Sequence, residues 1–293
     1  MLKPLFLRSN SVFFMFHVKP MAKGDFRFAT DLANTMGWNM APEDFQFNLN
    51  LDPGGCLVAF NGRERVGVAT CISFGKVGWF GNLIVKEKYR GKGAGRLLVK
   101  HALKYLQGKG AQTVGLYAYR DLHRFYGSLG FEVEQEFTVF EVESLGAFEQ
   151  KKLRVIGMLD IGEVERFDAS YFGADRKRLL ESIILEKGNL GYVWREGNVV
   201  EGYVAATVYE RMAWVGPMIC REGRGDVAIE LLRAALPNLS GKSVYTVLPK
   251  KETALANLLL SAGFKEGFSV SRMFFGEAVA KNCIYLAESL ERG

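Results

Sequence analysis

The sequence predicts a mixed α/β (α+β) protein with two tandem domains, each a mixed, mostly antiparallel central sheet flanked by helices. The first observation is that apolar stretches of strand length alternate with stretches of helical periodicity along all 293 residues. The second is that the chain repeats itself at an offset of 135 residues, which aligns Gly62 with Gly197, Trp79 with Trp214, and Gly81 with Gly216. A chain of this length also suits two hydrophobic cores better than one.

Strand and helix signals give the order of elements in the first copy. We expect strands at 14–20, at two or three places within 58–85, at 113–118 and at 134–142, and helices at 24–38, 96–106 and 121–130. The residues before the first strand resemble a signal peptide only weakly, because Arg8, Ser9 and Asn10 interrupt their apolar part. The first strand is therefore expected to open the first domain.

Three stretches of the first copy recur in the second. Residues 58–85 match 193–220, residues 96–103 match 230–236, and residues 126–137 match 259–270. The offset drifts by one residue between stretches, as expected when short loops gain or lose a residue. A period this long indicates two copies of one domain rather than a solenoid. We expect domains at 12–142 and 153–293, joined by a linker near 141–153.

Composition and cysteine usage favour a globular protein of the cell interior. The net charge of +6 is modest for this length, and no segment reaches the ~18 continuous apolar residues of a membrane span. Cys56, Cys71, Cys220 and Cys283 are scattered, with no CxxC pair and only three histidines in the chain. A zinc site or a disulfide framework is not expected from this pattern. We therefore predict a cytoplasmic protein that uses no metal.

The stretch "YRGKGAG" at residues 89–95 carries the chemistry that is easiest to predict. It lies between an apolar strand and a helix, so free backbone N–H groups and the positive end of the helix dipole meet at one place. Glycine lets the backbone approach a ligand closely and adopt positive φ. Arg90, Lys92 and Arg96 add full charges. The stretch therefore predicts an anion-binding loop that fits a pyrophosphate.

Other phosphate motifs fit this loop poorly. A Walker A loop needs Ser or Thr after its lysine, but Gly93 follows Lys92. A dinucleotide fingerprint needs a third glycine where Arg96 stands, and an acidic residue about twenty positions later. The pattern that fits is Arg-x-x-Gly-x-Gly, formed by Arg90, Gly93 and Gly95. The glycines alone would also serve a tight connection between a strand and a helix.

With this motif, the first copy resembles the GCN5-related N-acetyltransferase (GNAT) superfamily. The likeness extends from about residue 13 to 140, and includes "LIVKEKYRGKGAGRLLVKHALKYL" at 83–106 and a helix ending in "YGSLGF" at 126–131. Such proteins transfer an acetyl group from acetyl-CoA to an amine. The resemblance implies direct attack in a ternary complex on a primary amine of a small molecule or peptide, with acetyl-CoA as co-substrate.

The resemblance also assigns roles to residues. It places the pantetheine arm along the main chain of Leu83, Ile84 and Val85, with the N–H of Val85 as oxyanion donor. The pyrophosphate would be bound by Arg90 and by the N–H groups of Gly91, Lys92, Gly93, Ala94, Gly95 and Arg96. Tyr126 matches the tyrosine that protonates the departing thiolate. The family often has an asparagine where Tyr119 stands, which puts that contact in doubt here.

The second copy has lost the motif. "REGRGDVA" at 221–228 lacks clear counterparts of Gly93 and Gly95, and Asp226 places a negative charge where a pyrophosphate would lie. This arrangement resembles tandem acetyltransferases of the YitH-like kind, in which a divergent domain follows the first. We expect the C-terminal domain to hold no cofactor.

Several questions stay open on the sequence alone. The general base is not identified, and the acidic or imidazole side chains near the motifs are Glu43, Asp44, Glu87, Asp121 and His123. A non-catalytic acetyl-CoA sensor or scaffold remains an alternative. So does a basic nucleic-acid-binding protein, although acids interleave with the cations and no nucleic-acid module is recognised. No membrane partner is expected, and a homodimer is compatible with the sequence.

Overall fold

The computed structural model describes residues 15–146, 154–156 and 160–293. The first half contains β1 (Phe16–Pro20), α1 (Phe26–Asn34), α2 (Pro42–Leu51), β2 (Cys56–Asn61), β3 (Glu64–Ser73), β4 (Val77–Val85), α3 (Ala94–Gly108), β5 (Thr113–Ala118), α4 (His123–Gly127) and β6 (Glu132–Val142). The second half contains β7 (Arg154–Val155), α5 (Ile161–Phe172), α6 (Lys177–Ile184), β8 (Leu190–Glu196), β9 (Val199–Val208), β10 (Met212–Arg221), α7 (Gly225–Ala235), β11 (Ser243–Pro249), α8 (Thr253–Ser261), β12 (Lys265–Phe275) and β13 (Cys283–Leu286).

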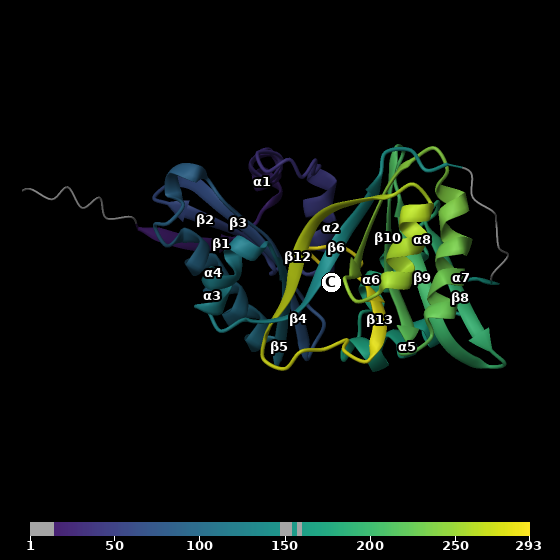
Figure 1. The fold of residues 1–293 in the computed structure, drawn as a ribbon. Coiled ribbons are helices and arrows are strands. Elements are labelled where there is room, and N and C mark those ends of the chain that lie inside the picture. The colour runs from purple at the N-terminus through teal and green to yellow at the C-terminus, as the bar shows by residue number, and fades with distance from the viewer. Residues whose placement is uncertain (1–14, 147–153, 157–159) are drawn as a thin grey trace, which may run out of the picture.

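The two halves repeat one order of elements, as the sequence predicts. Each has a short strand, two helices, an antiparallel set of three strands, a long helix, a strand, a short helix and a final strand. The fold class is confirmed, because the strands pair mostly antiparallel and helices cover both faces of the sheet (Figure 1). The expected helix at 24–38 is shorter than predicted, and α2 was not predicted. The last residues of the expected linker, 147–153, and the first of the expected domain, 12–14, lie outside the described residues.

The halves exchange their final strands. The order within the sheet is β1-β2-β3-β4-β5-β12-β6-β11-β10-β9-β8-β7, so β12 lies between β5 and β6, and β6 lies between β12 and β11. Ser271 of β12 is paired with Ala118 of β5 on one side and with Glu136 of β6 on the other. Twelve strands of the described structure therefore follow one another in a continuous sheet, and β13, paired with β10, is its thirteenth strand. Figure 1 shows β12 and β6 side by side at the centre of the molecule.

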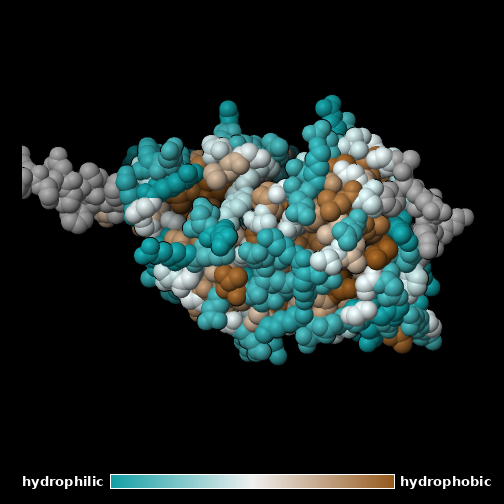
Figure 2. Space-filling model, viewed as in Figure 1, coloured by the Kyte–Doolittle hydropathy of each residue, from teal (hydrophilic) through white to brown (hydrophobic). Residues whose placement is uncertain are grey.

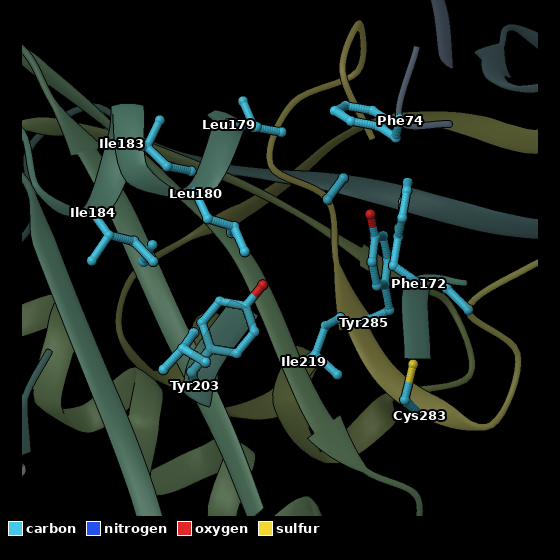
Figure 3. Packing of buried hydrophobic residues seen from close by; sticks show 14 of the residues in the cluster. Phe74, Phe172, Leu179, Leu180, Ile183, Ile184, Tyr203, Ile219, Cys283 and Tyr285 are labelled. Carbon is cyan, nitrogen blue, oxygen red and sulfur yellow. The ribbon is translucent and has the colours of Figure 1, made fainter. Parts of the chain in front are cut away.

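Helices bury the two faces of this sheet in separate clusters. In the first half, α3 packs on one face of β2–β5, and α1 and α2 pack on the other. The central cluster joins both halves: it includes Trp79 of β4, Phe172 of α5 and Tyr285 of β13. Figure 3 shows Leu180, Ile183 and Ile184 of α6 beside Tyr203 within the same cluster. Polar residues cover most of the outer surface in the view of Figure 2, with scattered apolar ones between them.

A buried ion pair lies where the halves meet. The Arg176 guanidinium donates to Asp168 from both Nε and Nη2, at 3.1 and 2.6 Å, and both side chains are fully buried. Nη1 of Arg176 also donates to the hydroxyl of Tyr285 and to the carbonyl oxygen of Gly293. A buried charge of this kind is tolerated only when its hydrogen bonds are satisfied. The network therefore fixes the last residues of the chain against α5 and α6.

The shared sheet predicts that the halves unfold together. Proline at Ser271 would remove one ladder hydrogen bond from a strand that is paired on both sides, at a cost of about 3 kcal/mol. We expect Ser271→Pro to lower the melting temperature of the whole chain by about 5–10 °C, in a single calorimetric transition.

Lys187→Pro is the matched control for this prediction. Lys187 is exposed and lies in a turn that closes with a hydrogen bond from Asn189 N to Glu186 O. Gly188, the third residue of the turn, has φ +96°. Lys187 is the second residue, and proline is favoured at that position of such a turn. The Lys187→Pro variant should leave the thermal unfolding transition unchanged. Two separate transitions, of which Ser271→Pro shifts only one, would show that the predicted domains 12–142 and 153–293 fold independently.

Candidate functional site

The candidate site starts where β4 leaves β5. These parallel strands are paired only at Val77–Trp79 with Thr113–Gly115, and in the described structure β5 does not pair with β4 beyond Trp79. On its other side, β4 stays paired with β3 up to Val85. Lys86 N donates to Val66 O at 2.8 Å, so Lys86 is hydrogen-bonded to β3. Along an antiparallel pair, every second residue is hydrogen-bonded to the partner strand. The N–H and carbonyl groups of Val85 and Leu83 therefore point away from β3. Their N–H groups therefore face the opening between β4 and β5.

A β-bulge at Asn82 produces this orientation. The register between β3 and β4 shifts between Val68 and Thr70, and Asn82 adopts φ +50°. Its buried side chain donates from Nδ2 to Oγ1 of Thr70 at 3.2 Å, which holds the left-handed residue in place. A bulge re-aims the main chain of the residues that follow it. Without it, Leu83 would present its N–H to β3 instead of to the opening.

The glycine-rich loop leads from this strand into α3. Gly91 and Gly93 have φ of +72° and +99°, and Gly93 is the N-cap of α3. A Cβ atom added at either glycine would meet nothing within 4 Å, so both face open space. The loop thus has the conformation that only glycine adopts easily, and it exposes the N-terminal N–H groups of a 15-residue helix. This is the geometry of an anion-binding site.

The three predicted cations, Arg90, Lys92 and Arg96, form hydrogen bonds around the loop and also give it positive charge. Arg90 donates from Nε to the carbonyl of Val85 at 3.0 Å, which closes the end of β4. Lys92 donates from Nζ to Lys88 O, and Arg96 donates from Nη2 to Oγ of Ser128 at 2.8 Å. All three are on the surface beside the loop, so their charge adds to that of the helix N-terminus.

Glu64 anchors the approach to the loop. Its carboxylate accepts from the Tyr89 hydroxyl at 2.6 Å and from the ammonium groups of Lys86 and Lys88. These hydrogen bonds, that of Tyr89 first, lower the pKa of Glu64 to about 2. The Glu64 carboxylate is therefore ionised at any pH used in an assay, and its hydrogen bonds to Tyr89, Lys86 and Lys88 do not depend on pH in that range.

Tyr126 lies on α4, beside the glycine loop. It is 5 % exposed and packs edge to face against Phe125 and Phe131. Phe125 also faces Gly95 at the start of α3, with its Cζ 3.7 Å from a Cβ built there. Burial raises the pKa of the Tyr126 hydroxyl well above its usual value of 10, so the phenol keeps its proton throughout the neutral range.

The face of β4 and β5 opposite α3 carries the other side of the site, and we call it the α2 face. On it lie Trp79 and Gly81 of β4, Tyr117 of β5 and the adjacent Tyr119. Tyr119 packs on Phe268 of β12 with ring centroids 5.4 Å apart. Burial raises the pKa of the Tyr119 hydroxyl, and Trp38, from the segment between α1 and α2, lies close enough to oppose part of that rise. An aromatic rim contributed by both halves therefore borders this face.

Several buried donors on the α2 face have unmet hydrogen-bonding capacity. Nε1 of Trp79, the hydroxyl of Tyr117 and Nη1 of Arg272 are buried and have no partner within the described residues. Arg272 is the register partner of Tyr117, so their side chains leave neighbouring strands on one face. Unpaired buried polar atoms of this kind are rare and call for an explanation. All three atoms lie beneath the surface of this face, where the described residues offer them no acceptor.

The equivalent opening in the second half is filled. The residues at the positions of Leu83, Ile84 and Val85, taken at the offset of 135, are Met218, Ile219 and Cys220. All three are paired antiparallel with β13, through Leu286, Tyr285 and Ile284. β10 stays paired with β11 only over Met212–Val215, so β13 enters where the two strands part. The chain's own strand occupies the slot that is open in the first half.

The second loop is also unlike the first. Arg224 precedes α7 and donates to Asp226, Glu196 and Glu201, so its charge is already neutralised. A cavity of about 290 Å³ lies at this loop, and its charged lining residues are Glu222, Glu252 and Lys251, two carboxylates against one ammonium group. Carboxylates at this position repel a pyrophosphate.

Comparison with known families agrees with the geometry. A family model described as "Acetyltransferase (GNAT) family" matches residues 26–131, and one described as "Acetyltransferase (GNAT) domain" matches residues 164–285. The chain belongs to the GNAT superfamily. It is a tandem GNAT protein, which confirms the family resemblance of the sequence.

Individual relatives align with this chain over most of their length. A curated holothin acyltransferase from a Pseudoalteromonas species is 24 % identical over 280 residues, which cover 94 % of each chain. The crystal structure of a putative acetyltransferase from Pyrococcus horikoshii aligns with a TM-score of 0.79 at 20 % identity, covering 100 % of this chain and 99 % of that one. A tandem GNAT protein from the clavulanic acid biosynthesis pathway aligns with a TM-score of 0.60 at 17 % identity, covering 91 % and 99 %.

The tandem GNAT structure gathers the sequence-predicted residues and adds others. Leu83, Val85, the loop at 90–96 and Tyr126 lie around the opening of β4 and β5. The sequence did not single out Asn82, Trp38 or the chain's last residues; a lone Asn after "WFG" was the only local signal of the bulge. None of the described helices is long and apolar enough to cross a membrane. The described residues contain no group of His, Cys, Asp or Glu arranged to hold a metal ion.

The loop geometry makes Gly93 the most sensitive position of the anion site. An alanine at φ +99° costs about 1–2 kcal/mol of backbone strain, and its methyl group would point into the open space before α3. We expect Gly93→Ala to weaken acetyl-CoA binding at least tenfold in calorimetric titration, while circular dichroism stays unchanged.

Gly108→Ala is the control at the opposite end of α3, where a Cβ also meets nothing within 4 Å and φ is not positive. It should bind acetyl-CoA like the wild type. Equal affinity of both variants would show that the loop does not approach the pyrophosphate.

Proposed function

We propose that this tandem GNAT protein is an N-acyltransferase that moves an acetyl group from acetyl-CoA to a primary amine in a ternary complex. One observation carries the proposal: an unpaired edge of β4 leads directly into a left-handed glycine loop at a helix N-terminus. The edge offers main-chain groups to an amide-containing arm, and the loop offers N–H groups to a pyrophosphate. Pantetheine pyrophosphate contains both groups at a fixed separation.

The residues around the opening account for the chemistry. The N–H of Val85, or that of Leu83 on the same side of β4, would donate to the thioester oxygen as it gains negative charge. The buried phenol of Tyr126 would protonate the departing thiolate. Arg90, Gly91, Lys92, Gly93, Ala94, Gly95 and Arg96 would hold the pyrophosphate, which keeps the thioester in line with the acceptor.

The acceptor is proposed to be an amine on a small molecule or peptide. The α2 face borders the opening of β4, and its rim of Trp38, Tyr119 and Phe268 favours an amine with an apolar body. The relative that is 24 % identical is named for holothin, which supports a small-molecule acceptor. A protein of the cytoplasm would have acetyl-CoA available.

The second GNAT unit is proposed to act as a structural partner without a cofactor. Its slot is occupied by β13 and its loop is lined by carboxylates, whereas its β12 completes the sheet beside β5. Its contribution to catalysis would then be Phe268 and the chain's last residues, which reach the α2 face. The domain limits 12–142 and 153–293 remain a proposal for the evolutionary units.

Tyr126→Phe tests the role of the phenol. If Tyr126 supplies the proton to the thiolate, the variant should bind acetyl-CoA with unchanged affinity and lose about 10²-fold in kcat. Steady-state thiol release at saturating acetyl-CoA measures this. Phe125→Leu, on the adjacent packing position, controls for a loosened helix; an equal loss in both variants would mean that Tyr126 only packs.

The filled slot predicts one acetyl-CoA per chain. Equilibrium dialysis of the intact chain should saturate at one tight site, and Gly93→Ala should weaken that site at least tenfold without revealing another. Two tight sites would contradict the assignment of the second half. One tight site with no transfer to any amine would favour the acetyl-CoA sensor or scaffold instead, and salt-sensitive retention on heparin without acetyl-CoA binding would favour a nucleic-acid-binding protein.

A further inference from the structure

The last residues of the chain connect the two GNAT openings. After β13, the chain passes Gly216 of β10 so closely that a Cβ there would lie 1.9 Å from the carbonyl oxygen of Ala287. It then crosses to the first half, where a Cβ on Gly81 would lie 2.5 Å from Cα of Glu291. Gly293 ends on the ring of Trp79. Figure 1 shows this end of the chain, marked C, at the centre of the molecule between α2 and α6.

The contact at Gly81 places the backbone and Cβ of Glu291 against the strand that carries the proposed acyl site. Gly81 immediately precedes the bulge at Asn82, and the N–H groups of Leu83 and Val85 follow it. Any side chain at position 81 would displace the backbone of Glu291, so the glycine makes this approach possible. Glu291 therefore lies over β4 on the α2 face, whereas the glycine loop and Tyr126 lie toward the α3 side.

We propose that Glu291 is the acceptor-binding base: it receives the ammonium group of the acceptor and takes its proton. This rests on the proposed N-acyltransferase function and adds the residue that the sequence leaves unidentified. It also gives the second half a direct part in the reaction, because the residue belongs to the last segment of the chain.

The surroundings of Glu291 suit a cation. Glu288 on the same segment and Asp44 on α2 face it with negative charge, and Arg292 is the cation nearby. Tyr209, from the turn between β9 and β10, completes the groups around it and stays protonated because burial, first, raises its pKa to about 12. Three carboxylates against one guanidinium leave a net negative site, which an ammonium group would balance.

Glu291 is more available than Glu288. Arg292 donates from Nε and Nη2 to the two oxygens of Glu288, at 2.8 and 3.0 Å, and the Glu288 side chain is 2 % exposed. Glu291 accepts from Nη1 of Arg292 at 2.8 Å and its side chain is 21 % exposed. Burial, first among the causes, raises the pKa of Glu291 above its ordinary value, and a higher pKa makes a carboxylate a stronger base.

The proton balance of the proposed step is complete. One ammonium proton passes to the Glu291 carboxylate and then to solvent, which leaves a neutral amine. The nitrogen lone pair forms the C–N bond, and the C–S bond breaks with its electron pair on sulfur. The thiolate takes a proton from the Tyr126 hydroxyl. Tyr126 regains a proton, through solvent, from the nitrogen that has attacked. The last of the three ammonium protons stays on the amide nitrogen.

The test compares Glu291→Gln with Glu277→Gln in the intact chain, using acetyl-CoA and phenethylamine, an apolar primary amine. Glu277 is exposed in the segment between β12 and β13, and Glu277→Gln removes the same charge as Glu291→Gln. For Glu291→Gln we expect kcat/KM for the amine to fall by ~10²-fold or more at pH 7, with acetyl-CoA affinity unchanged within about twofold. The wild type and Glu277→Gln should lose activity as pH falls through the pKa of Glu291, and this acidic limb should be absent in Glu291→Gln. Glu291→Asp should recover part of the rate.

Two outcomes would overturn the proposal. If Glu291→Gln retains the wild-type rate and the acidic limb, Glu291 is not the base, although the N-acyltransferase assignment stands. If the wild type binds acetyl-CoA but transfers to neither phenethylamine nor any other amine offered, the proposed function fails and the base assignment fails with it.

Discussion

The antiparallel pairing of β6 with β12 is the interaction on which the rest of this structure depends. Each strand ends one copy of the GNAT fold and completes the sheet of the other copy. If either strand left, a central pair of edges would be exposed, with unpaired N–H and carbonyl groups in the middle of the protein. The two copies are consequently one folded body with a single sheet, and neither half has a complete sheet of its own.

The two copies share one sheet and differ in structure at their equivalent openings. The first copy keeps an open edge on β4 and a loop of left-handed glycines. In the second copy, β13 pairs with the equivalent edge of β10, and carboxylates line the equivalent loop. The pairing of β13 satisfies main-chain groups that a pantetheine arm would otherwise meet. It also directs the last residues toward the α2 face of the first copy, where the proposed acceptor site lies.

The sequence predicted the parts of this arrangement that depend on local signals. The glycine loop is visible because a positive φ, as at Gly93, favours glycine. The two copies are visible because Trp79 and Trp214 align at the offset of 135 residues. The exchange of β6 and β12 has no local signal, since the pattern of apolar residues in a strand does not name the strand with which it pairs. The position of Glu291 depends on a close approach to Gly81, more than 200 residues away in the chain, so periodicity and motif spacing could not predict it.

Hydrogen exchange of backbone amides, with and without saturating acetyl-CoA, tests the central claim most directly: the cofactor binds along β4 and the glycine loop of the first copy alone. The amides of Leu83 and Val85 face the opening and should exchange fast in the free protein. With acetyl-CoA, these amides and those of Gly91 to Arg96 should become protected, while Met218 to Val227 should not change. Protection at the second loop, or none at Leu83 and Val85, would contradict the account.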